Sequence, residues 1–426
     1  MKSKLGLRGG LALASTLLGA IVPATAQDAP TGDIKVGFIL PAADPNDPLQ
    51  SALVRGATQG ATMAAQEFGD NAALFDLVFQ VNMETATGPD EVVVAAQRLV
   101  NDDGAFAIVG GYSLAEATAL GQWAAGEGVP FFNVGAPSDS LRNDACAATT
   151  FHIQPSAAMY LDAIAGWYVR AGLRNWYFVQ SDDAEGTAQY DRLRYALEVN
   201  HFAAREAGRV AIGPDDSLED LARTIARSNA DLVVLLLDPD AQIAAVSAME
   251  SAGVGAMVTG FPWPETQTRD YFAALRTAAP TLGAQFRATA WEATLDAYGA
   301  REVNARYRDQ FGEPMSSSAW AAYQGINILY TAALFGGVTN GQDVVAYLVN
   351  QNNVFDLWKG IGASFRPWDR QLRQPLYLVK ITDTATDPLD LGLLVGELPA
   401  IYLPGTDPVE RLDQLGDLAA RSRCGS

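Results

Sequence analysis

The sequence predicts an α/β fold with two lobes, each built on a mainly parallel sheet that is flanked by helices. Short β-branched, aliphatic or aromatic runs alternate along the chain with alanine-rich stretches of helical period, which is typical of buried parallel sheets covered on both faces. The pattern restarts near residue 149, so two units of similar size are expected. The length of 426 residues allows two or three domains or two large lobes.

The first unit contains four expected strands with a helix between each of them and the next. A turn-rich loop, 41–48, follows the first strand. The expected strands are Ile34–Leu40, Phe75–Val81, Phe106–Val109 and Val129–Val134, and the expected helices are Gln50–Phe68, Pro89–Asn101 and Leu114–Gly126.

The second unit repeats this alternation after a short lead-in at Thr149–Ile153. Its longest aliphatic run, LVVLLL, is typical of a strand buried on both faces. The expected strands are Trp176–Gln180, Arg209–Ile212, Asp231–Leu237 and Ala256–Thr259, and the expected helices are Ala157–Ala171, Thr187–Asn200, Leu218–Asn229 and Asp240–Ala252.

A third section follows the proline-rich stretch Phe261–Pro264. It begins with an expected strand, Ala284–Trp291, and ends with a stretch that resembles a β-hairpin, Ala363–Thr382. Three helices are expected between them: Ala300–Phe311, Ser318–Phe335 and Gly341–Asn350. Four prolines after Asp387 predict a mostly extended tail, with short helical character at Val409–Ala420.

The N-terminus, Met1–Ala26, has the three parts of a secretory signal peptide: a positive start, an apolar run of twelve residues and a small-x-small cleavage site. No later segment approaches the ~20 apolar residues of a membrane-spanning helix. We therefore expect an exported, soluble protein. An even number of cysteines in an exported chain favours a disulfide between Cys146 and Cys424, and the alternative is two free thiols.

Charge and motifs exclude several classes of protein. The formal net charge of −20 disfavours non-specific nucleic-acid binding, which needs a basic face. The two histidines, His152 and His201, are too far apart for a local zinc motif, and no nucleophile elbow, metalloprotease motif or P-loop is present. We expect no metal, no cofactor and no catalytic residues. His152 is expected to be a hydrogen-bonded hinge residue.

Several stretches, in this order, resemble the type I periplasmic substrate-binding proteins, and most of all the branched-chain amino acid binding family of ABC importers. They are Ile34–Pro41, Gly56–Gly69, Ala107–Ala115, Val129–Ser138, Phe151–Ser156, Ala230–Gly253 and Ala319–Ala333. Two departures count against a leucine-type ligand: Glu185 stands where many members have tyrosine, and the loop 42–48 lacks the usual Ser/Thr-Gly. The segment 365–375 and the cysteine-bearing tail resemble a narrower branch associated with pyrroloquinoline-quinone-dependent alcohol oxidation.

The resemblance implies a hinge of three crossovers, near Ile153–Ser156, Phe261–Thr268 and Asn353–Ser364. It divides the chain into a signal peptide, two lobes and a tail. The signal peptide is 1–26, the N-terminal lobe is 27–152 with 265–355, the C-terminal lobe is 153–264 with 356–386, and the extended tail is 387–426.

The candidate ligand-binding residues follow the carboxyl ends of expected strands, where loops and helix N-termini converge. Ser113, Ser138 and the aspartates could equally be helix caps or turn residues, and the aromatic residues could belong to the core. The candidates are Gly111, Tyr112, Ser113, Ala136, Pro137 and Ser138 in the first lobe, Asp182, Asp183 and Asp238 in the second, and the aromatic residues Trp263 and Tyr323.

These observations favour a periplasmic, monomeric binding protein that closes on a small polar or amino-acid-like ligand and delivers it to an inner-membrane ABC permease. An accessory or sensor protein of a quinoprotein alcohol dehydrogenase system is the alternative from a different class. An enzyme is the third interpretation, and the motif search does not favour it.

Overall fold

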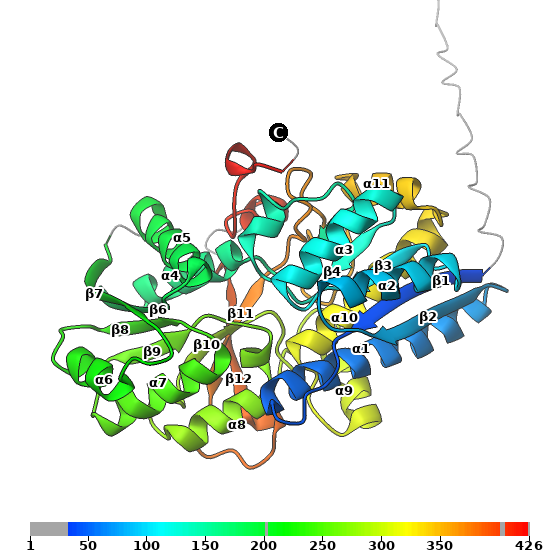
Figure 1. The fold of residues 1–426 in the computed structure, drawn as a ribbon. Helices are drawn as coiled ribbons and strands as arrows, with labels where there is room; N and C mark the ends of the chain where they lie inside the picture. Colours follow the sequence, from blue (N-terminus) through cyan, green and yellow to red (C-terminus); the bar gives the residue numbers. More distant parts are fainter. Residues whose placement is uncertain (1–32, 201–202, 401–404, 425–426) are drawn as a thin grey trace, which may run out of the picture.

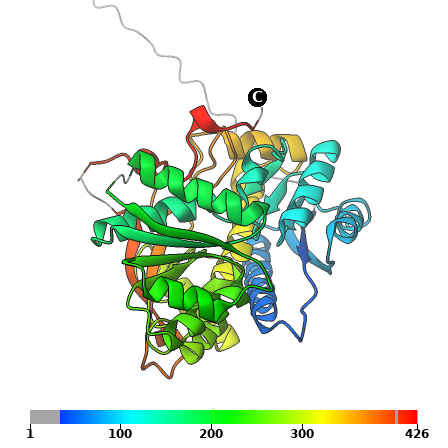
Figure 2. The same ribbon diagram turned by 60° about the vertical axis from the view of Figure 1, so that its left-hand side comes forward.

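A computed structural model describes residues 33–200, 203–400 and 405–424. The expected signal peptide, Met1–Ala26, lies outside the described residues. The described chain forms two lobes that lie side by side, and each has its own sheet and its own helices (Figures 1 and 2). The α/β fold class expected from the sequence is confirmed.

The N-terminal lobe is built on a five-stranded parallel sheet with the order β2-β1-β3-β4-β5. Its strands are β1 Asp33–Leu40, β2 Val78–Thr85, β3 Ala107–Gly110, β4 Phe131–Asn133 and β5 Thr150–His152. Its helices are α1 Pro48–Ala73, α2 Pro89–Asn101, α3 Leu114–Glu127, α9 Ala300–Phe311, α10 Ser317–Gly336 and α11 Gly341–Val349. Alternate side chains of β1 serve opposite faces: Phe38 packs with α1 and α10, whereas Ile39 packs with α2 and α3.

Close approach of α1 and α10 covers one face of this sheet. A Cβ atom at Gly60 would lie 2.1 Å from the carbonyl oxygen of Ala319, so only glycine allows the two backbones to come this close. Both helices therefore bury small residues where they meet, and large aromatic residues such as Trp320 and Tyr323 lie elsewhere on α10, in the same core.

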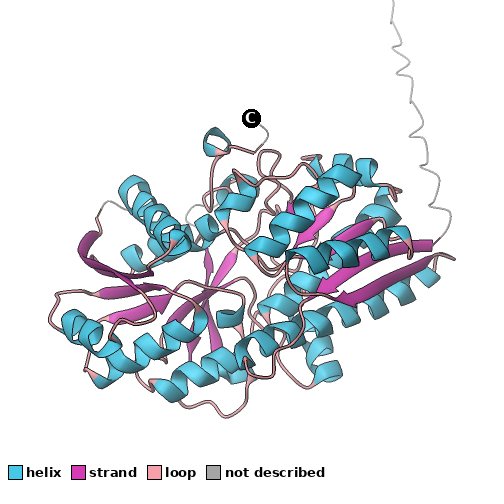
Figure 3. Cartoon of the chain, viewed as in Figure 1, coloured by secondary structure: helices cyan, strands magenta, loops and turns pink. Residues whose placement is uncertain are grey.

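The C-terminal lobe is built on a four-stranded parallel sheet with the order β7-β6-β8-β9, beside an antiparallel sheet with the order β10-β11-β12 (Figure 3). The strands are β6 Asn175–Ser181, β7 Arg205–Ile212, β8 Leu232–Leu236, β9 Met257–Gly260, β10 Phe286–Thr289, β11 Leu376–Ile381 and β12 Gly392–Leu398. The helices are α4 Ala157–Arg170, α5 Ala184–Asn200, α6 Leu218–Ala226, α7 Pro239–Ser251 and α8 Arg269–Ala278.

The chain changes from one hydrophobic core to the other three times. Ile153 belongs to the N-terminal core and Ala157 to the C-terminal core; the chain returns between Ala290 and Trp291, and crosses again between Leu372 and Leu376. The expected second and third crossovers were therefore wrong.

The expected lobe boundaries at 265 and 356 need correction for the same reason. Residues 265–290 pack in the C-terminal lobe because α8, an unexpected helix that lies beside α7, buries Tyr271, Phe272 and Leu275 in the hydrophobic core of that lobe. Residues 356–372 pack in the N-terminal lobe, where Phe365 contacts Phe132 and Phe151.

The expected hairpin at 363–382 is also wrong. Only one antiparallel bridge, Phe365 to Leu372, closes the turn, and β11 pairs instead with β10 and β12. The tail is not merely extended: β12 completes the antiparallel sheet, and a short helix, α12 Pro408–Leu412, follows it.

The tail is fixed to both lobes. Cys424 forms a disulfide with Cys146 of the N-terminal lobe, and the backbone N–H of Gly416 donates to Asp162 of α4 at 2.8 Å. In Figures 1 and 2 the red C-terminal segment lies where the lobes meet.

One buried pair of side chains links all three crossovers. Gln374 donates from Nε2 to the carbonyl of Ile153 at 2.6 Å, and its Oε1 accepts from Lys359 Nζ at 2.7 Å. Lys359 also donates to the carbonyl of Ala290, and its ammonium lies 4.1 Å from the ring centroid of Trp320. Burial holds the pKa of Lys359 well below its ordinary value. The hinge is therefore a hydrogen-bonded unit rather than three independent linkers.

Candidate functional site

A cavity of about 290 Å³ lies between the lobes. The N-terminal lobe contributes the loops that follow β3 and β4, and the C-terminal lobe contributes the start of α5 and the loops that follow β8 and β9. Ligands of open α/β sheets bind at this end, beyond the carboxyl ends of the strands. The lining residues are Tyr112, Ser113, Leu114, Ala136, Pro137, Ser138, Glu185, Asp238, Pro239, Trp263, Pro264 and Glu265.

Seven of the eleven predicted residues line this cavity. They are Tyr112, Ser113, Ala136, Pro137, Ser138, Asp238 and Trp263. They come from both lobes and from four separate loops, so the fold brings together residues up to about 150 positions apart in the chain.

The first loop is shaped by a capping box at the start of α3. Ser113 Oγ accepts from the N–H of Glu116 at 3.2 Å, and the Glu116 carboxylate accepts in return from the N–H of Ser113 at 3.2 Å and of Tyr112 at 3.3 Å. Ser113 is therefore both a helix cap and a cavity residue. The Tyr112 hydroxyl is buried and has no hydrogen-bond partner within the described residues.

The second loop is held by buried polar side chains. Asn133 Oδ1 accepts from the N–H groups of Gly135 at 3.2 Å and Ala136 at 2.9 Å. Asn133 Nδ2 lies 3.1 Å from Nδ1 of His152, whose pKa is lowered well below its ordinary value by burial. A neutral imidazole accepts this hydrogen bond. Ser138 does not cap the turn that follows it, and its hydroxyl lies 3.1 Å from that of Ser140.

The C-terminal lobe presents an aromatic wall and acidic groups. Trp263 is fixed because its indole N–H donates to the carbonyl of Leu237 at 2.8 Å. Asp238 is exposed and caps α7 by accepting from the N–H of Ala241 at 2.8 Å. Burial, opposed by a hydrogen bond from its own backbone and reinforced by the charge of Asp47, raises the pKa of Glu265 to about 7. Burial also raises the pKa of Glu185.

Glu185 and Glu265 line the cavity but were not among the predicted ligand-binding residues. Glu185 was noted as a departure from the family pattern and as one of the acidic residues after the strand Trp176–Gln180, but it was not selected as a ligand-binding residue. Glu265 follows the proline-rich stretch after β9. Nothing in the local sequence indicates which way the side chain of a residue in such a loop points.

Four predicted residues lie outside the cavity. Gly111 is buried at φ +78°, where a Cβ would lie 2.8 Å from the Phe131 ring, so it shapes the loop. Tyr323 is buried in the N-terminal core and donates to Glu67. Asp182 is exposed, and Asp183 accepts from the N–H of Gly186 at 2.7 Å at the start of α5. The turn and core alternatives therefore hold for these positions.

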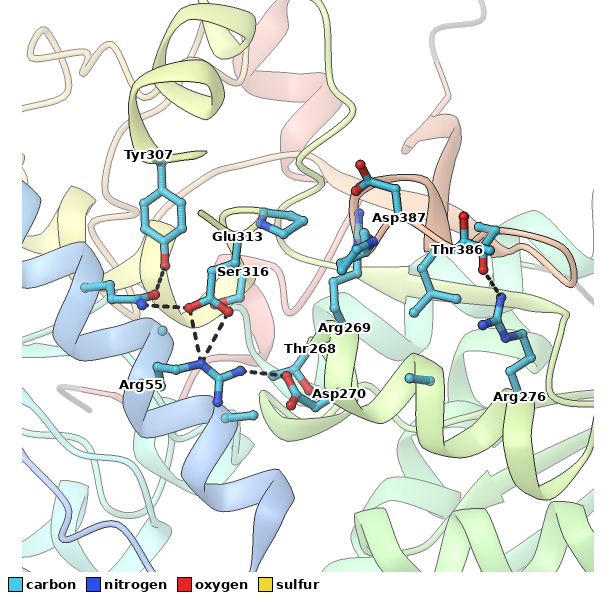
Figure 4. A pocket seen from close by; sticks show the side chains of 18 residues that line it. Arg55, Thr268, Arg269, Asp270, Arg276, Tyr307, Glu313, Ser316, Thr386 and Asp387 are labelled. Atoms are coloured by element: carbon cyan, nitrogen blue, oxygen red, sulfur yellow. Dashed lines mark hydrogen bonds and ion pairs between the residues drawn. The ribbon is translucent and has the colours of Figure 1, made fainter. Parts of the chain in front are cut away.

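A second cavity, of about 330 Å³, lies between α1 and α8 (Figure 4). Arg55 of α1 pairs with Asp270 of α8 at 2.7 Å and with Glu313 at 3.2 Å. Arg276 donates to the carbonyls of Ala385 at 2.8 Å and of Thr382 at 3.1 Å. These guanidinium groups are already bonded to the protein, so this region is an ion-paired contact between the lobes.

Within the described residues, no group of three or more histidine, cysteine, aspartate or glutamate side chains could hold a metal ion. None of the helices described by the structure is long and apolar enough to cross a membrane.

Comparison with known proteins places the chain in a family. A model of the periplasmic binding proteins matches residues 33–386. A branched-chain amino acid ABC transporter periplasmic ligand-binding protein from Burkholderia xenovorans LB400 is similar in structure, with a TM-score of 0.77, 16% identity, and coverage of 92% of this chain and 99% of that one. No curated protein sequence matches the chain.

Two of the similar structures that contain ligands differ in the kind of ligand bound. A solute-binding protein of an ABC transporter from Rhodopseudomonas palustris BisB5, in complex with 3,4-dihydroxybenzoic acid, has a TM-score of 0.70 and 18% identity, covering 88% of this chain and 99% of that one. The branched-chain amino acid binding protein LivJ from Streptococcus pneumoniae, in complex with isoleucine, has a TM-score of 0.68 and 14% identity, covering 85% and 99%.

Proposed function

The chain belongs to the periplasmic binding protein family, and from this premise we propose that it binds a small ligand in the interlobe cavity and delivers it to an inner-membrane ABC permease. The observation that carries the proposal is the cavity itself, because both lobes supply its walls at the carboxyl ends of their strands. A ligand that touches both walls favours the closed arrangement of the lobes, and closure gives a permease a shape to recognise.

The apolar wall supports a binding role for a molecule of limited size. Aromatic and proline side chains with a few polar groups are typical of small-molecule sites, and the volume is at the lower end of their range of about 300–1,000 Å³. The similar structures that contain isoleucine or an aromatic acid agree with this size class. The signal sequence at Met1–Ala26 supports a periplasmic location.

Thermal unfolding of the mature protein against a panel of amino acids, carboxylates, amines and alcohols tests the proposal. A ligand at 100 times its dissociation constant should stabilise the folded state by about 2.7 kcal/mol. Leu114→Trp places a bulky ring in the cavity. Val94→Trp on α2 is the matched control, because Leu114 and Val94 are both apolar residues on the surface, with 38% and 48% of their area exposed.

The ligand-induced shift should disappear in Leu114→Trp and persist in Val94→Trp. An equal shift in both variants would place binding elsewhere and contradict the proposal. No shift with any compound would favour the alternative, an accessory protein of a quinoprotein alcohol dehydrogenase system. A permease gene and an ATPase gene beside this one would favour import.

A further inference from the structure

All ionisable side chains that line the interlobe cavity are acidic. Glu185, Asp238 and Glu265 contribute carboxyl groups, and no lysine, arginine or histidine is among the lining residues that the structure describes. A carboxylate ligand would therefore meet no basic side chain on the cavity wall. It would depend on the hydroxyl groups of Ser113 and Ser138 and on backbone N–H groups at helix N-termini, which are the other common anion site in this fold.

The N-terminal lobe already uses four of those backbone donors. The N–H groups of Tyr112 and Ser113, before α3, donate to the carboxylate of Glu116. The N–H groups of Gly135 and Ala136 donate to Asn133. Glu116 is 5% exposed and Asn133 is fully buried. A ligand anion could replace either acceptor only if that buried side chain moved out of the protein interior.

The C-terminal lobe is similar. Pro239 occupies the first position of α7 and has no N–H, while Asp238 accepts from the N–H of Ala241. At the start of α5, the N–H of Gly186 donates to Asp183 at 2.7 Å. At each of these four loops, oxygen atoms of the protein accept from one or two of the backbone N–H groups that a ligand anion could use.

The remaining features of the cavity suit a positive group. Trp263 and Tyr112 supply aromatic surface, which attracts cations as well as apolar groups. The Tyr112 hydroxyl is buried and has no hydrogen-bond partner among the described residues. The charge of Asp47, the N-cap residue of α1, also acts on Glu265 and Asp240 of the C-terminal lobe and adds to the acidic character of this region.

We propose that the ligand is a small organic cation, a protonated amine carried on an apolar or aromatic body, and not a carboxylic acid. This inference rests on the proposed function and specifies its substrate class. It differs from the ligands in the similar structures, whose 3,4-dihydroxybenzoic acid and isoleucine both carry a carboxyl group.

Matched ligands that differ mainly in charge test the inference. Benzylamine, benzyl alcohol and benzoate form one series, and butylamine, butanol and butyrate form a second. Isothermal titration at pH 7.5 should give amines a dissociation constant about tenfold or more below that of the alcohol, with no measurable binding of the carboxylate. Higher salt should weaken only the amine.

Variants identify the groups responsible. Glu265→Gln and Glu185→Gln should each weaken the amine about tenfold and leave the alcohol unchanged. Glu127→Gln, at the exposed end of α3, is the matched control and should change neither. The two site variants lie on different segments, so failure of one to fold still leaves the other as a test.

Two other outcomes would overturn the inference that the ligand is a cation. In the first, a carboxylate binds as tightly as the amine of its series; in the second, the alcohol is the tightest binder of its series. Both outcomes would still agree with ligand binding in the interlobe cavity. Amine binding that resists both site variants would also overturn the inference. If no member of either series binds and no compound of the unfolding panel stabilises the protein, the proposed function itself fails.

Discussion

Replacing Glu265 by glutamine should change how the stability of the protein depends on pH. Glu265 faces the other acidic lining residues, Glu185 and Asp238, and lies within reach of the charge of Asp47. Burial raises its pKa to about 7, so the folded state favours the protonated form. Stability is therefore fully present below the unfolded pKa near 4.5 and is lost as the pH rises towards 7.

The magnitude follows from the pKa difference. At about 1.36 kcal/mol per pKa unit, the full shift corresponds to about 3 kcal/mol. Because the Glu265 side chain is half-buried, solvent screening reduces the expected effect to about 1–2 kcal/mol. Glutamine cannot ionise, so Glu265→Gln should gain this amount over the wild-type protein between pH 4.5 and pH 8.

Denaturation by urea at the two pH values, followed by tryptophan fluorescence, measures the difference in free energy of unfolding. Other groups also titrate, and the half-buried Asp139, with a pKa raised to about 6 by burial, acts in the same direction. Its effect is common to both proteins and cancels in the comparison. A difference between variant and wild type that stays constant within about 0.5 kcal/mol from pH 4.5 to pH 8 would refute the reasoning.

Two further predictions concern the scaffold. Cys424→Ser should lower the free energy of unfolding by up to about 5 kcal/mol, because the disulfide to Cys146 closes a sequence separation of 278 residues. A reductant should destabilise only the wild-type protein. If the reductant leaves the unfolding midpoint of the wild-type protein unchanged, the disulfide is contradicted. Gly60→Ala should cost about 3 kcal/mol in thermal or urea unfolding because its Cβ meets the Ala319 carbonyl, whereas Gly69→Ala, with a nearest contact of 3.4 Å, is the control. Equal stability of the two glycine variants would show that α1 and α10 can separate without cost.

Most elements of the fold could be predicted from the sequence. The strand Ile34–Leu40 and the helices 89–101 and 300–311 lie within a residue of their observed limits, because periods of two and 3.6 residues are local properties of the chain. The helix Arg269–Ala278 was missed. Its charged residues obscure an apolar face, and that face can be recognised only in the folded protein, where it packs in the core of the C-terminal lobe.

The candidate site could be predicted in part. The loops after β3 and β4 were identified because the carboxyl ends of parallel strands meet at one edge of the sheet. Tyr323 was assigned wrongly because an aromatic residue near a helix start has the same local pattern in a core as in a cleft. Glu265 was missed because nothing local tells where a loop after a strand directs its side chains.

The sequence by itself determined the fold class, the two β-α-β units and the order of their loops, since these depend on periodicity within short segments. Only the tertiary structure decided that residues 265–290 and 356–372 belong to the opposite lobes from those expected. It also decided that Glu185, Asp238 and Glu265 line one cavity in which several of the nearby N–H groups donate to oxygen atoms of the protein. These properties depend on which apolar faces pack together across hundreds of residues, and such packing is a property of the whole chain rather than of any segment.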